Sequence, residues 1–588
     1  MPDANVTKAL LSAAAAGLAA AGTASAQTVQ YTERAGDAGL IVRYIQPPGD
    51  ATYTPMPGGA VAGDFNNDGW CDLIVLRGGG DGPGRLFIND AHAGPVTFTA
   101  RGVEKIVTWV LHESTDVPRP FFWNGKDYLL KMADDLDFVV DALGVDAWHI
   151  GSGASVYDYD GDGWLDIYVT SMGPITGFER HAHRLYRNTG AEGFFGFKQV
   201  ASIAGVATTG EFEGDGYGAS WGDYDLDGDA DLAVAGWTQG NFGNRLFTNN
   251  GDGTFADSTG ALQHPTFDFR GFSPRFADMD GDFYPELLWT ADFGTSHYFI
   301  NNTDGTFTEA TAASGTGLDT NGMGSFVADI NNDGMPDWYV TSIDDPIKRR
   351  TGNMAYVNAG DHTFDERAVE LGVMAGYWGW GVAGHDFDND TDIDIAETNG
   401  WILHPNLVDP SILWMQTDPL KFTAPAAISG FNHFGQGRGL LCFDPDNDGD
   451  LDIVVTTNDD RLFYFESDAA DRGNHWLKLQ LETSASANLA PLGLGAHVVA
   501  TITIEGESVE LHRWMQSGPN YLTADEPGIH LGLGNAPTID RLEIRWPNGT
   551  TRVLEDVPSD QALVRASCPG DFTGDHALDI FDVLAYLD

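Results

Sequence analysis

Seven short acidic segments share one spacing of oxygen-bearing side chains. In GDYDLDGDADLAVAGW (residues 222–237), carboxylates occupy positions 223, 225, 227, 229 and 231, directly before an apolar run. Gly228 breaks the strand and lets the chain curl. Oxygens at loop positions one, three, five and nine and the carbonyl of position seven can then converge on one hard cation such as Ca²⁺. For a single copy, the alternative is a solvated turn rich in Asp and Gly.

The spacing recurs, which favours the metal interpretation over chance turns. The other copies are DFNNDGWCD from Asp64, DYDGDGWLD from Asp158, DMDGDFYPE from Asp278, DINNDGMPD from Asp329, DFDNDTDID from Asp386 and DPDNDGDLD from Asp444. Successive copies begin 51 to 94 residues apart, and each precedes a short apolar run typical of a buried strand. This period predicts one supersecondary unit per repeat.

The composition is strongly acidic without being that of a disordered chain. The 588 residues include 86 Asp and Glu against 31 Lys and Arg, a formal net charge of −55, while 42% of the residues are apolar and can build cores. This charge argues against nucleic-acid and anionic-membrane partners. We also expect the fold to weaken when bound metal is removed, because the carboxylates then repel one another.

Residues 1–27 are typical of a secretory signal peptide. Lys8 precedes the apolar run LLSAAAAGLAAAG, and ASA before Gln27 forms an A-x-A type cleavage site. No later apolar stretch is long enough to span a bilayer as a helix. We therefore expect an exported protein, secreted or at the cell surface, where calcium concentrations suit weak sites.

Two further repeats flank the acidic loops. Before each loop comes a strand with spaced glycines, as in GYGASWGD at 216–223, and glycine within a strand marks close backbone approach. After the loops come apolar strands around turns, as in RLFTNNGDGTFADST from Arg245, which predict hairpins. Seven four-stranded units predict an all-β fold with a seven-bladed β-propeller over residues 28–466. We expect residues 28–40 to complete blade seven; an unclosed solenoid is the alternative.

The D-x-[DN]-x-D-G-x-x-D loops between strands resemble the FG-GAP or VCBS repeats of integrin α propellers, in which these loops bind Ca²⁺. The resemblance implies up to seven calcium sites. Phe283 and Glu286 depart from the pattern in the fourth loop, and Thr391 departs from it in the sixth. The implied ligands are Asp64, Asn66, Asp68, Trp70, Asp72, Asp158, Asp160, Asp162, Trp164, Asp166, Asp223, Asp225, Asp227, Asp229, Asp231, Asp278, Asp280, Asp282, Tyr284, Glu286, Asp329, Asn331, Asp333, Met335, Asp337, Asp386, Asp388, Asp390, Asp392, Asp394, Asp444, Asp446, Asp448, Asp450 and Asp452.

A second domain is expected after the linker at 467–473. Alternating strands such as WLKLQL, HVVATITI and RLEIRW predict a small antiparallel β domain over residues 474–566. NHWL at 474, SGPNYLTADEPGIHLGLG at 517 and LEIRWPNGT at 542 resemble the ASPIC/UnbV domain. Joined to a calcium propeller, it is similar to the family that includes the cartilage acidic proteins. The resemblance implies an architecture and no established catalysis.

The last stretch, residues 568–588, resembles one half of a dockerin. The implied ligands for one more calcium ion are Asp571, Thr573, Asp575, Asp579 and Asp582. A dockerin has two such halves and one is present. The tail is therefore either a docking element for a cohesin-like partner or surface anchor, or a truncated remnant.

One residue lies between the paired glycines of each repeat, and all seven are expected around the ring axis. The candidate ligand-binding residues among them are Tyr217, Phe272, Met323, Trp380 and Arg438. The alternative is that these side chains only plug the channel. Ring closure would bring Cys71 and Cys442 near each other, although we expect them not to form a disulfide.

The long interval between the first two loops indicates an insertion at about 103–148. Within it, DYLLKMADDLDFVVDALGV places apolar residues at helical spacing from Leu129 to Leu143. We expect a helix packed on the propeller, with a lid over a ligand site as the alternative.

The motifs favour binding over catalysis. We find no HExxH, Walker or CxxC motif and expect no G-x-S-x-G nucleophile elbow, and nearly all acidic pairs are assigned to calcium, so no catalytic residue is predicted. We expect a secreted calcium-binding propeller that mediates extracellular binding or adhesion to a protein or glycan, with glycans as the leading ligand. The alternative is a calcium-dependent polysaccharide-active enzyme.

Overall fold

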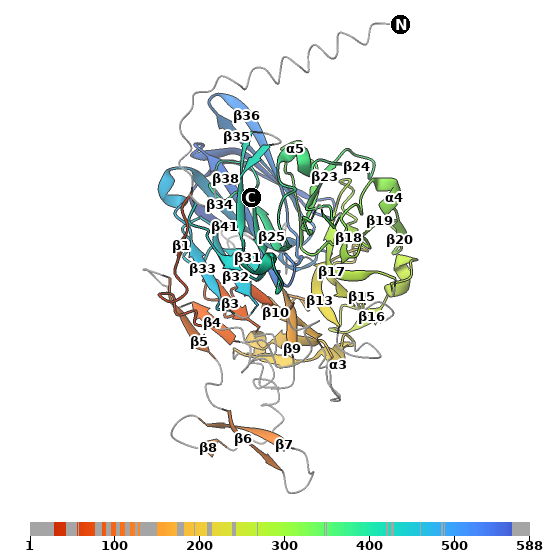
Figure 1. The fold of residues 1–588 in the computed structure, drawn as a ribbon. Helices are drawn as coiled ribbons and strands as arrows, with labels where there is room; N and C mark the ends of the chain where they lie inside the picture. Colours follow the sequence, from red (N-terminus) through yellow and green to blue (C-terminus); the bar gives the residue numbers. More distant parts are fainter. Residues whose placement is uncertain are drawn as a thin grey trace, which may run out of the picture.

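The computed structural model of the chain is an all-β fold, as the sequence predicts (Figure 1). Among the described residues, no helix combines the length and the apolar character needed to cross a bilayer. The predicted signal peptide and the dockerin-like tail lie outside the described residues. The structure describes residues 29–566 except 43–55, 57, 77–84, 90–95, 102–105, 112–117, 124–127, 130–149, 173–181, 193–194, 208–214, 238–242, 267, 346, 349, 419–420, 425–428, 459, 484–485 and 487.

Seven sheets, each built around four antiparallel strands, make up the body of the molecule. Sheet by sheet, these strands are β2 (Ala60–Gly63), β3 (Asp72–Val75), β4 (Arg85–Asn89) and β5 (Phe98–Arg101); β9 (Ile150–Tyr157), β10 (Asp166–Met172), β11 (Arg184–Asn188) and β12 (Phe197–Gln199); β13 (Gly216–Gly222), β14 (Asp231–Gly236), β15 (Arg245–Asn249) and β16 (Phe255–Asp257); β17 (Arg270–Ala277), β18 (Glu286–Asp292), β19 (His297–Asn301) and β20 (Phe307–Glu309); β21 (Ser325–Ala328), β22 (Asp337–Val340), β23 (Met354–Asn358) and β24 (Phe364–Glu366); β25 (Gly379–His385), β26 (Asp394–Asn399), β28 (Ile412–Asp418) and β29 (Lys421–Thr423); and β31 (Gly437–Phe443), β32 (Asp452–Thr457), β33 (Phe463–Glu466) and β1 (Thr32–Glu33).

Short helices and one additional strand pair connect the strands of these sheets. One more strand pair joins β27 (Asp409–Pro410) to β30 (Phe434–Gly435). Within the described ranges, the helices are α3 (Ala201–Ala204), α4 (Thr311–Ser314), α5 (Ala368–Leu371) and the 3₁₀ turns η1 (Gly190–Glu192), η2 (Thr259–Leu262), η3 (Asn406–Val408), η4 (Ala470–Arg472) and η5 (Pro491–Gly493).

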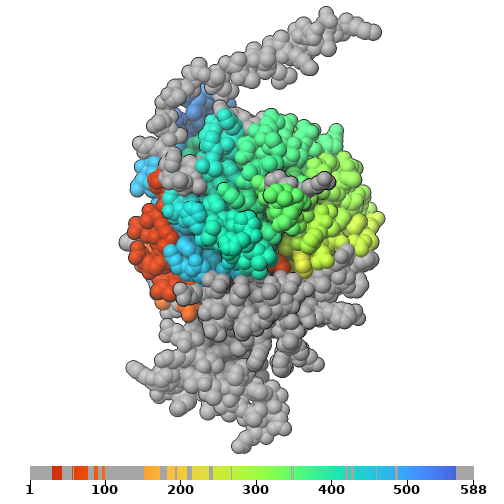
Figure 2. Space-filling model, in the orientation of Figure 1, coloured from red at the N-terminus to blue at the C-terminus, as the bar shows by residue number. Residues whose placement is uncertain are grey.

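The sheets form a closed ring. The first strand of each sheet contacts the first strand of the next, in the order β2, β9, β13, β17, β21, β25, β31 and back to β2. The last sheet is completed by the N-terminus, since Thr32 pairs with Glu466 and Glu33 with Phe465, and Figure 2 shows the red N-terminal residues beside the light-blue ones. This pairing confirms the predicted role of the N-terminal segment and rules out the open solenoid.

Close contact between the innermost strands explains their glycines. A Cβ on Gly153 would lie 2.3 Å from the carbonyl oxygen of Tyr217, and one on Gly324 would lie 2.3 Å from that of Trp380. Any larger residue would therefore force these strands apart. Apolar side chains fill the space between neighbouring sheets, so the core is a ring of clusters.

The C-terminal domain packs two sheets around one apolar core that contains Leu477, Leu511 and Trp546. The first sheet holds β38 (Ile529–Gly534), β34 (His475–Glu482) and β41 (Gln561–Ala566), and the second holds β36 (Glu507–Trp514), β35 (His497–Ile504), β39 (Thr538–Arg545) and β40 (Thr551–Pro558). One pair corrects the predicted antiparallel topology, because β34 and β41 run parallel. Many residues connect these two strands, so no tight hairpin imposes opposite directions on them.

A segment of the C-terminal domain enters the ring. Its short strand β37 (Thr523–Ala524) adds parallel to β2, with Thr523 opposite Ala60, and Ser517 forms a bridge with Trp221. Tyr521 and Leu522 then lie in the apolar cluster at the ring axis. The two domains are thus joined by backbone pairing and by core packing.

The part of the insertion that the structure describes holds strands that were not predicted. It contains a separate three-stranded sheet of β6 (Ile106–Leu111), β7 (Pro118–Trp123) and β8 (Tyr128–Leu129) (Figure 1). Leu129, expected to open a helix, belongs to a strand instead, because it pairs with Phe122 across a hairpin. The rest of the predicted helix lies outside the described residues.

Candidate metal centres and the ring axis

All seven acidic loops hold their first carboxylate in the same way. In the third loop, Asp223 Oδ1 accepts the N–H of Asp227 at 3.1 Å and Asp223 Oδ2 accepts the N–H of Gly228 at 3.0 Å. The same two bonds, to positions five and six, recur in the other six loops. The spacing of the sequence therefore fixes one local conformation seven times.

The two loops that lack glycine at position six keep this conformation. The residue at that position has a φ between 73° and 96° in all seven loops, including 73° at Phe283 and 94° at Thr391. Such angles favour glycine and strain other residues, a β-branched one most. The departures in the fourth and sixth loops therefore change the side chain and the local strain, while the turn itself is preserved.

The carboxylate at position nine belongs to a second recurring arrangement. In the third loop, Asp231 accepts the N–H of Tyr224 at 3.0 Å and the N–H of Asn249 at 2.9 Å. The Asn249 side chain in turn donates to the carbonyl of Ala230 in its own loop and to that of Tyr159 in the preceding loop. An asparagine on the third strand thus ties adjacent loops together.

Sequence reasoning missed these asparagines. Equivalent bonds are made by Asn89, Asn188, Asn301 and Asn358. A signal was present, since an Asn ends the third strand in RLFIND, RLYRNTG, RLFTNNG, YFINNTDG and AYVNAG. The role of this Asn depends on a carbonyl in the neighbouring repeat, and the sequence of one repeat does not reveal that contact.

The donor atoms fit a hard cation. Three carboxylate oxygens lie within 4.8 Å of one another in the second, third, fourth and sixth loops. The groups are Asp158, Asp160 and Asp166; Asp223, Asp225 and Asp227; Asp278, Asp280 and Asp282; and Asp386, Asp388 and Asp394. In the first and fifth loops, Asn66 and Asn331 instead turn their amide NH₂ groups toward the carboxylates of Asp68 and Asp333.

Three of the carboxylates present a buried oxygen to which no described residue donates a hydrogen bond. These are the Oδ1 atoms of Asp160, Asp225 and Asp388, all at loop position three. A buried anionic oxygen without a partner is costly, and nearby carboxylates increase that cost. All-oxygen ligation by Asp, Asn and backbone carbonyls is the donor set that Ca²⁺ prefers, so the residues fit this ion.

The electrostatics of the loops point the same way. Burial, followed by the charge of Asp227, raises the pKa of Asp223 to about 8. Burial likewise raises the pKa of Asp158 to about 7 and those of Asp72 and Asp337 to about 8. Close, dehydrated carboxylates stay ionised together only when a cation lies among them.

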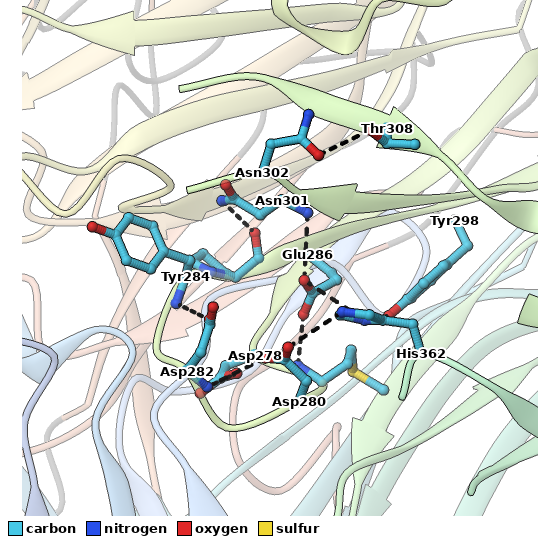
Figure 3. A network of polar contacts seen from close by, with 12 residues as sticks. Asp278, Asp280, Asp282, Tyr284, Glu286, Tyr298, Asn301, Asn302, Thr308 and His362 are labelled. Atoms are coloured by element: carbon cyan, nitrogen blue, oxygen red, sulfur yellow. Dashed lines mark hydrogen bonds and ion pairs between the residues drawn. The ribbon is translucent and has the colours of Figure 1, made fainter. Parts of the chain in front are cut away.

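The fourth loop receives a histidine from the next blade (Figure 3). His362 Nε2 lies 3.2 Å from an oxygen of Asp280, and its Nδ1 lies 3.0 Å from the hydroxyl of Tyr298 and 4.0 Å from Glu286. Glu286 occupies position nine and accepts the N–H groups of Met279 and Asn301, as an Asp does elsewhere. The longer side chain therefore preserves the bonding of that position.

The C-terminal domain contacts the sixth and seventh loops through polar side chains. Lys478 Nζ is 3.8 Å from Asp444 in the seventh loop and 2.8 Å from Glu526. In the sixth loop, Asn474 donates to the carbonyl of Asp388, and His530 Nε2 lies 2.7 Å from Asn389 Oδ1. These contacts were not predicted, because they join residues 34 to 141 positions apart.

The predicted ligand-binding residues at the ring axis do come together, but they pack around Tyr521 of the C-terminal domain. Tyr217, Phe272, Met323, Trp380 and Arg438 are each at most 2% exposed. The ring of Tyr521 lies 5.4 Å from that of Phe272 and 5.1 Å from that of Trp380, and the Arg438 guanidinium lies 4.5 Å from the Trp380 ring centre. A ligand would have to displace Tyr521. The packing favours the plug alternative, and the ligand role stays a prediction.

Several other side chains that could do chemistry have structural roles in the fold. His183 is buried, its Nδ1 accepts the N–H of Ser171, and burial lowers its pKa to about 3. The pentapeptide GASWG at 218–222 does match the G-x-S-x-G pattern, although no such elbow was expected. Ser220, however, is buried within β13 and donates to the carbonyl of Ser517, so it forms no exposed elbow. Cys71 and Cys442 are free and buried, as expected.

Family models match two parts of the chain. An FG-GAP-like repeat model matches residues 158–234, 223–289 and 278–340, and an ASPIC and UnbV model matches residues 487–566. Among solved structures, YCF48 from Cyanidioschyzon merolae covers 72% of this chain and 99% of its own, with 12% identity and a TM-score of 0.32. A TM-score this low does not establish a shared fold.

Curated relatives carry one shared name. Cartilage acidic protein 1 from Xenopus tropicalis is 26% identical over 269 residues, and the protein of that name from Homo sapiens is 26% identical over 268 residues. Each match covers 44% of this chain and 38% of the relative, so the chain spans well under half the length of these proteins. The chain therefore joins FG-GAP-like repeats to an ASPIC and UnbV domain and is similar to the cartilage acidic proteins.

Proposed function

We propose that this chain is a secreted binding protein whose propeller is held together by calcium. The observation that supports calcium best is the set of buried Oδ1 atoms of Asp160, Asp225 and Asp388, which lack donors and lie beside further carboxylates. A cation at each loop neutralises these groups and stiffens the turn between the first two strands of a blade. The relatives' name and the FG-GAP-like repeats favour an extracellular binding role.

The ligand surface is proposed at the end of the ring opposite the metal loops. The loops there carry the half-buried Trp237, Trp378 and Trp401 and the exposed Phe293 and Tyr377. The rings of Trp378 and Trp401 stack at 4.9 Å, and the Arg350 guanidinium lies 5.1 Å from Trp378. Flat aromatic faces beside hydrogen-bond donors suit the apolar faces and hydroxyls of sugars, which favours a glycan ligand.

The test is a glycan array probed with the mature chain in calcium and in chelator. The proposal expects binding to a defined glycan set that weakens at least tenfold in Tyr377→Ala or Phe293→Ala. Val369→Ala removes an apolar side chain of α5 that is more exposed than Tyr377 or Phe293 and serves as the control. Glycan binding that is unchanged in chelator would overturn the proposal that calcium holds the binding surface together. Turnover of a polysaccharide would favour the enzyme alternative.

A further inference from the structure

A nitrogen, a sulfur and a carboxylate oxygen converge where the two domains meet. His385 ends β25, Cys442 lies in β31, and Asp525 directly follows β37 of the C-terminal domain. Their potential ligand atoms all lie within 4.8 Å of one another, and His385 Nε2 is 3.0 Å from Asp525 Oδ2. Three segments that are distant in sequence thus meet at one point.

The carboxylate is held in place by further bonds. Asp525 Oδ1 accepts the N–H of Cys442 at 2.7 Å and the side-chain amide of Asn520 at 2.7 Å. Asp525 Oδ2 is thereby directed to His385. Outer hydrogen bonds of this kind orient metal ligands in proteins.

A cavity of about 140 Å³ lies beside these residues, between the ring and the C-terminal domain. His385 and Asp525 line it together with His530, Arg275 and Arg513. The Nδ1 atom of His530 is buried and has no hydrogen-bond partner among the described residues, whereas its Nε2 is engaged by Asn389. A second imidazole nitrogen is therefore free in the wall of the same cavity.

This donor set differs from that of the acidic loops. The loops offer oxygen alone and suit calcium, whereas a thiolate with an imidazole and a carboxylate suits Zn²⁺. Three protein ligands leave a fourth position of a tetrahedral ion for a water or a small ligand. The adjoining cavity gives that position room.

We propose that His385, Cys442 and Asp525 form a zinc site that bridges the two domains, with an open coordination position facing the cavity. Binding forms the metal–sulfur bond and releases the Cys442 proton to solvent. The site is independent of the calcium proposal, since it shares no ligand with the acidic loops. The competing explanation is that His385 and Asp525 form a simple ion pair beside a packed cysteine.

Cobalt titration of the calcium-saturated mature chain tests the site. Co²⁺ replaces Zn²⁺ and gives a thiolate-to-metal charge-transfer band only when sulfur is a ligand. In a Cys568→Ala background we expect one equivalent to give this band, Zn²⁺ to abolish it, Cys442→Ala to lose it and Cys71→Ala to retain it. Absence of the band, or its survival in Cys442→Ala, would overturn the proposal, as would its loss in Cys71→Ala with the fold intact.

A second variant covers the case in which Cys442→Ala fails to fold. His385 is partly exposed, so His385→Gln leaves the core unchanged. We expect zinc affinity to fall by more than about 100-fold, because loss of an outer-shell partner alone costs about 10- to 100-fold. Unchanged zinc affinity in a folded His385→Gln protein would contradict the proposal.

Discussion

The third and seventh acidic loops each carry five carboxylates at the same loop positions, but the charged side chains around them differ. In the third loop, the charges that act most strongly on Asp223 and Asp231 are those of other carboxylates. In the seventh, the Lys478 ammonium of the C-terminal domain lies 3.8 Å from Asp444. Burial alone would lower the pKa of Lys478, but the charges of Glu526 and Asp444 outweigh burial and raise it. The same motif therefore lies in two different electrostatic environments, and we expect the third loop to depend more strongly on bound metal.

Calcium removal should give the largest effect and should separate the two loops. Each site filled at a free calcium concentration of 100 times its Kd adds about 2.7 kcal/mol to the free energy of unfolding. We expect chelation to lower the melting temperature markedly. Hydrogen exchange should then accelerate more over residues 222–237 than over residues 443–458. Equal acceleration in both segments would break the comparison, and unchanged melting would refute calcium binding.

Loss of the lysine should come next in size. Lys478→Met leaves the buried Asp444 and the half-buried Glu526 without their cation, and breaking a buried pair costs about 3–5 kcal/mol. Denaturant unfolding in calcium should show this loss. Lys348→Met, which removes a lysine that is 64% exposed, should change stability by less than about 1 kcal/mol. Equal stability of the two variants would mean that Lys478 does not stabilise the seventh loop.

The asparagine between loops should have a smaller effect. Asn249→Ala removes the donor to two buried carbonyls, those of Tyr159 and Ala230, and should destabilise the protein by about 1–3 kcal/mol. Its neighbour is a matched control, because Asn250 is exposed and its side chain bonds only to Thr254 among the described contacts. Thermal melting of both variants decides the point, and a loss as large in Asn250→Ala would contradict it.

The smallest effect should come from backbone strain at position six. Gly69 has φ +87° and open space at its Cβ, so Gly69→Thr should cost about 1–2 kcal/mol through backbone strain alone. Thr391→Gly should stabilise the sixth loop by about 1 kcal/mol or less, because the flexibility of glycine in the unfolded chain offsets part of the gain. Equilibrium unfolding measures both changes, and a destabilising Thr391→Gly would contradict this account.

Local features of the fold were predictable, whereas long-range ones were not. All the ligands of one loop lie within nine residues, so spacing alone indicates both the turn and the strands around it. The glycines of the inner strands were interpretable because close approach has a clear steric meaning, as at Gly153 and Gly324. These features depend on neighbours in sequence and recur seven times.

The polar segment SGPNYLTADEP gave no such signal. It has the composition of a surface loop, yet it places Tyr521 at the ring axis and Asp525 beside His385. Lys478 likewise sits in an ordinary strand pattern, and only the docking of the domain brings it to the seventh loop. Contacts between domains depend on two surfaces at once, and neither surface is marked by periodicity in the sequence.

A crystal structure of the mature chain grown in calcium, with anomalous data collected at a long wavelength, tests the central claim most directly. The account predicts anomalous peaks within ligand distance of the Oδ1 atoms of Asp160, Asp225 and Asp388. Peaks at these three loops would establish that a metal ion neutralises their carboxylates. Ordered water without anomalous signal at all three, in saturating calcium, would contradict the account.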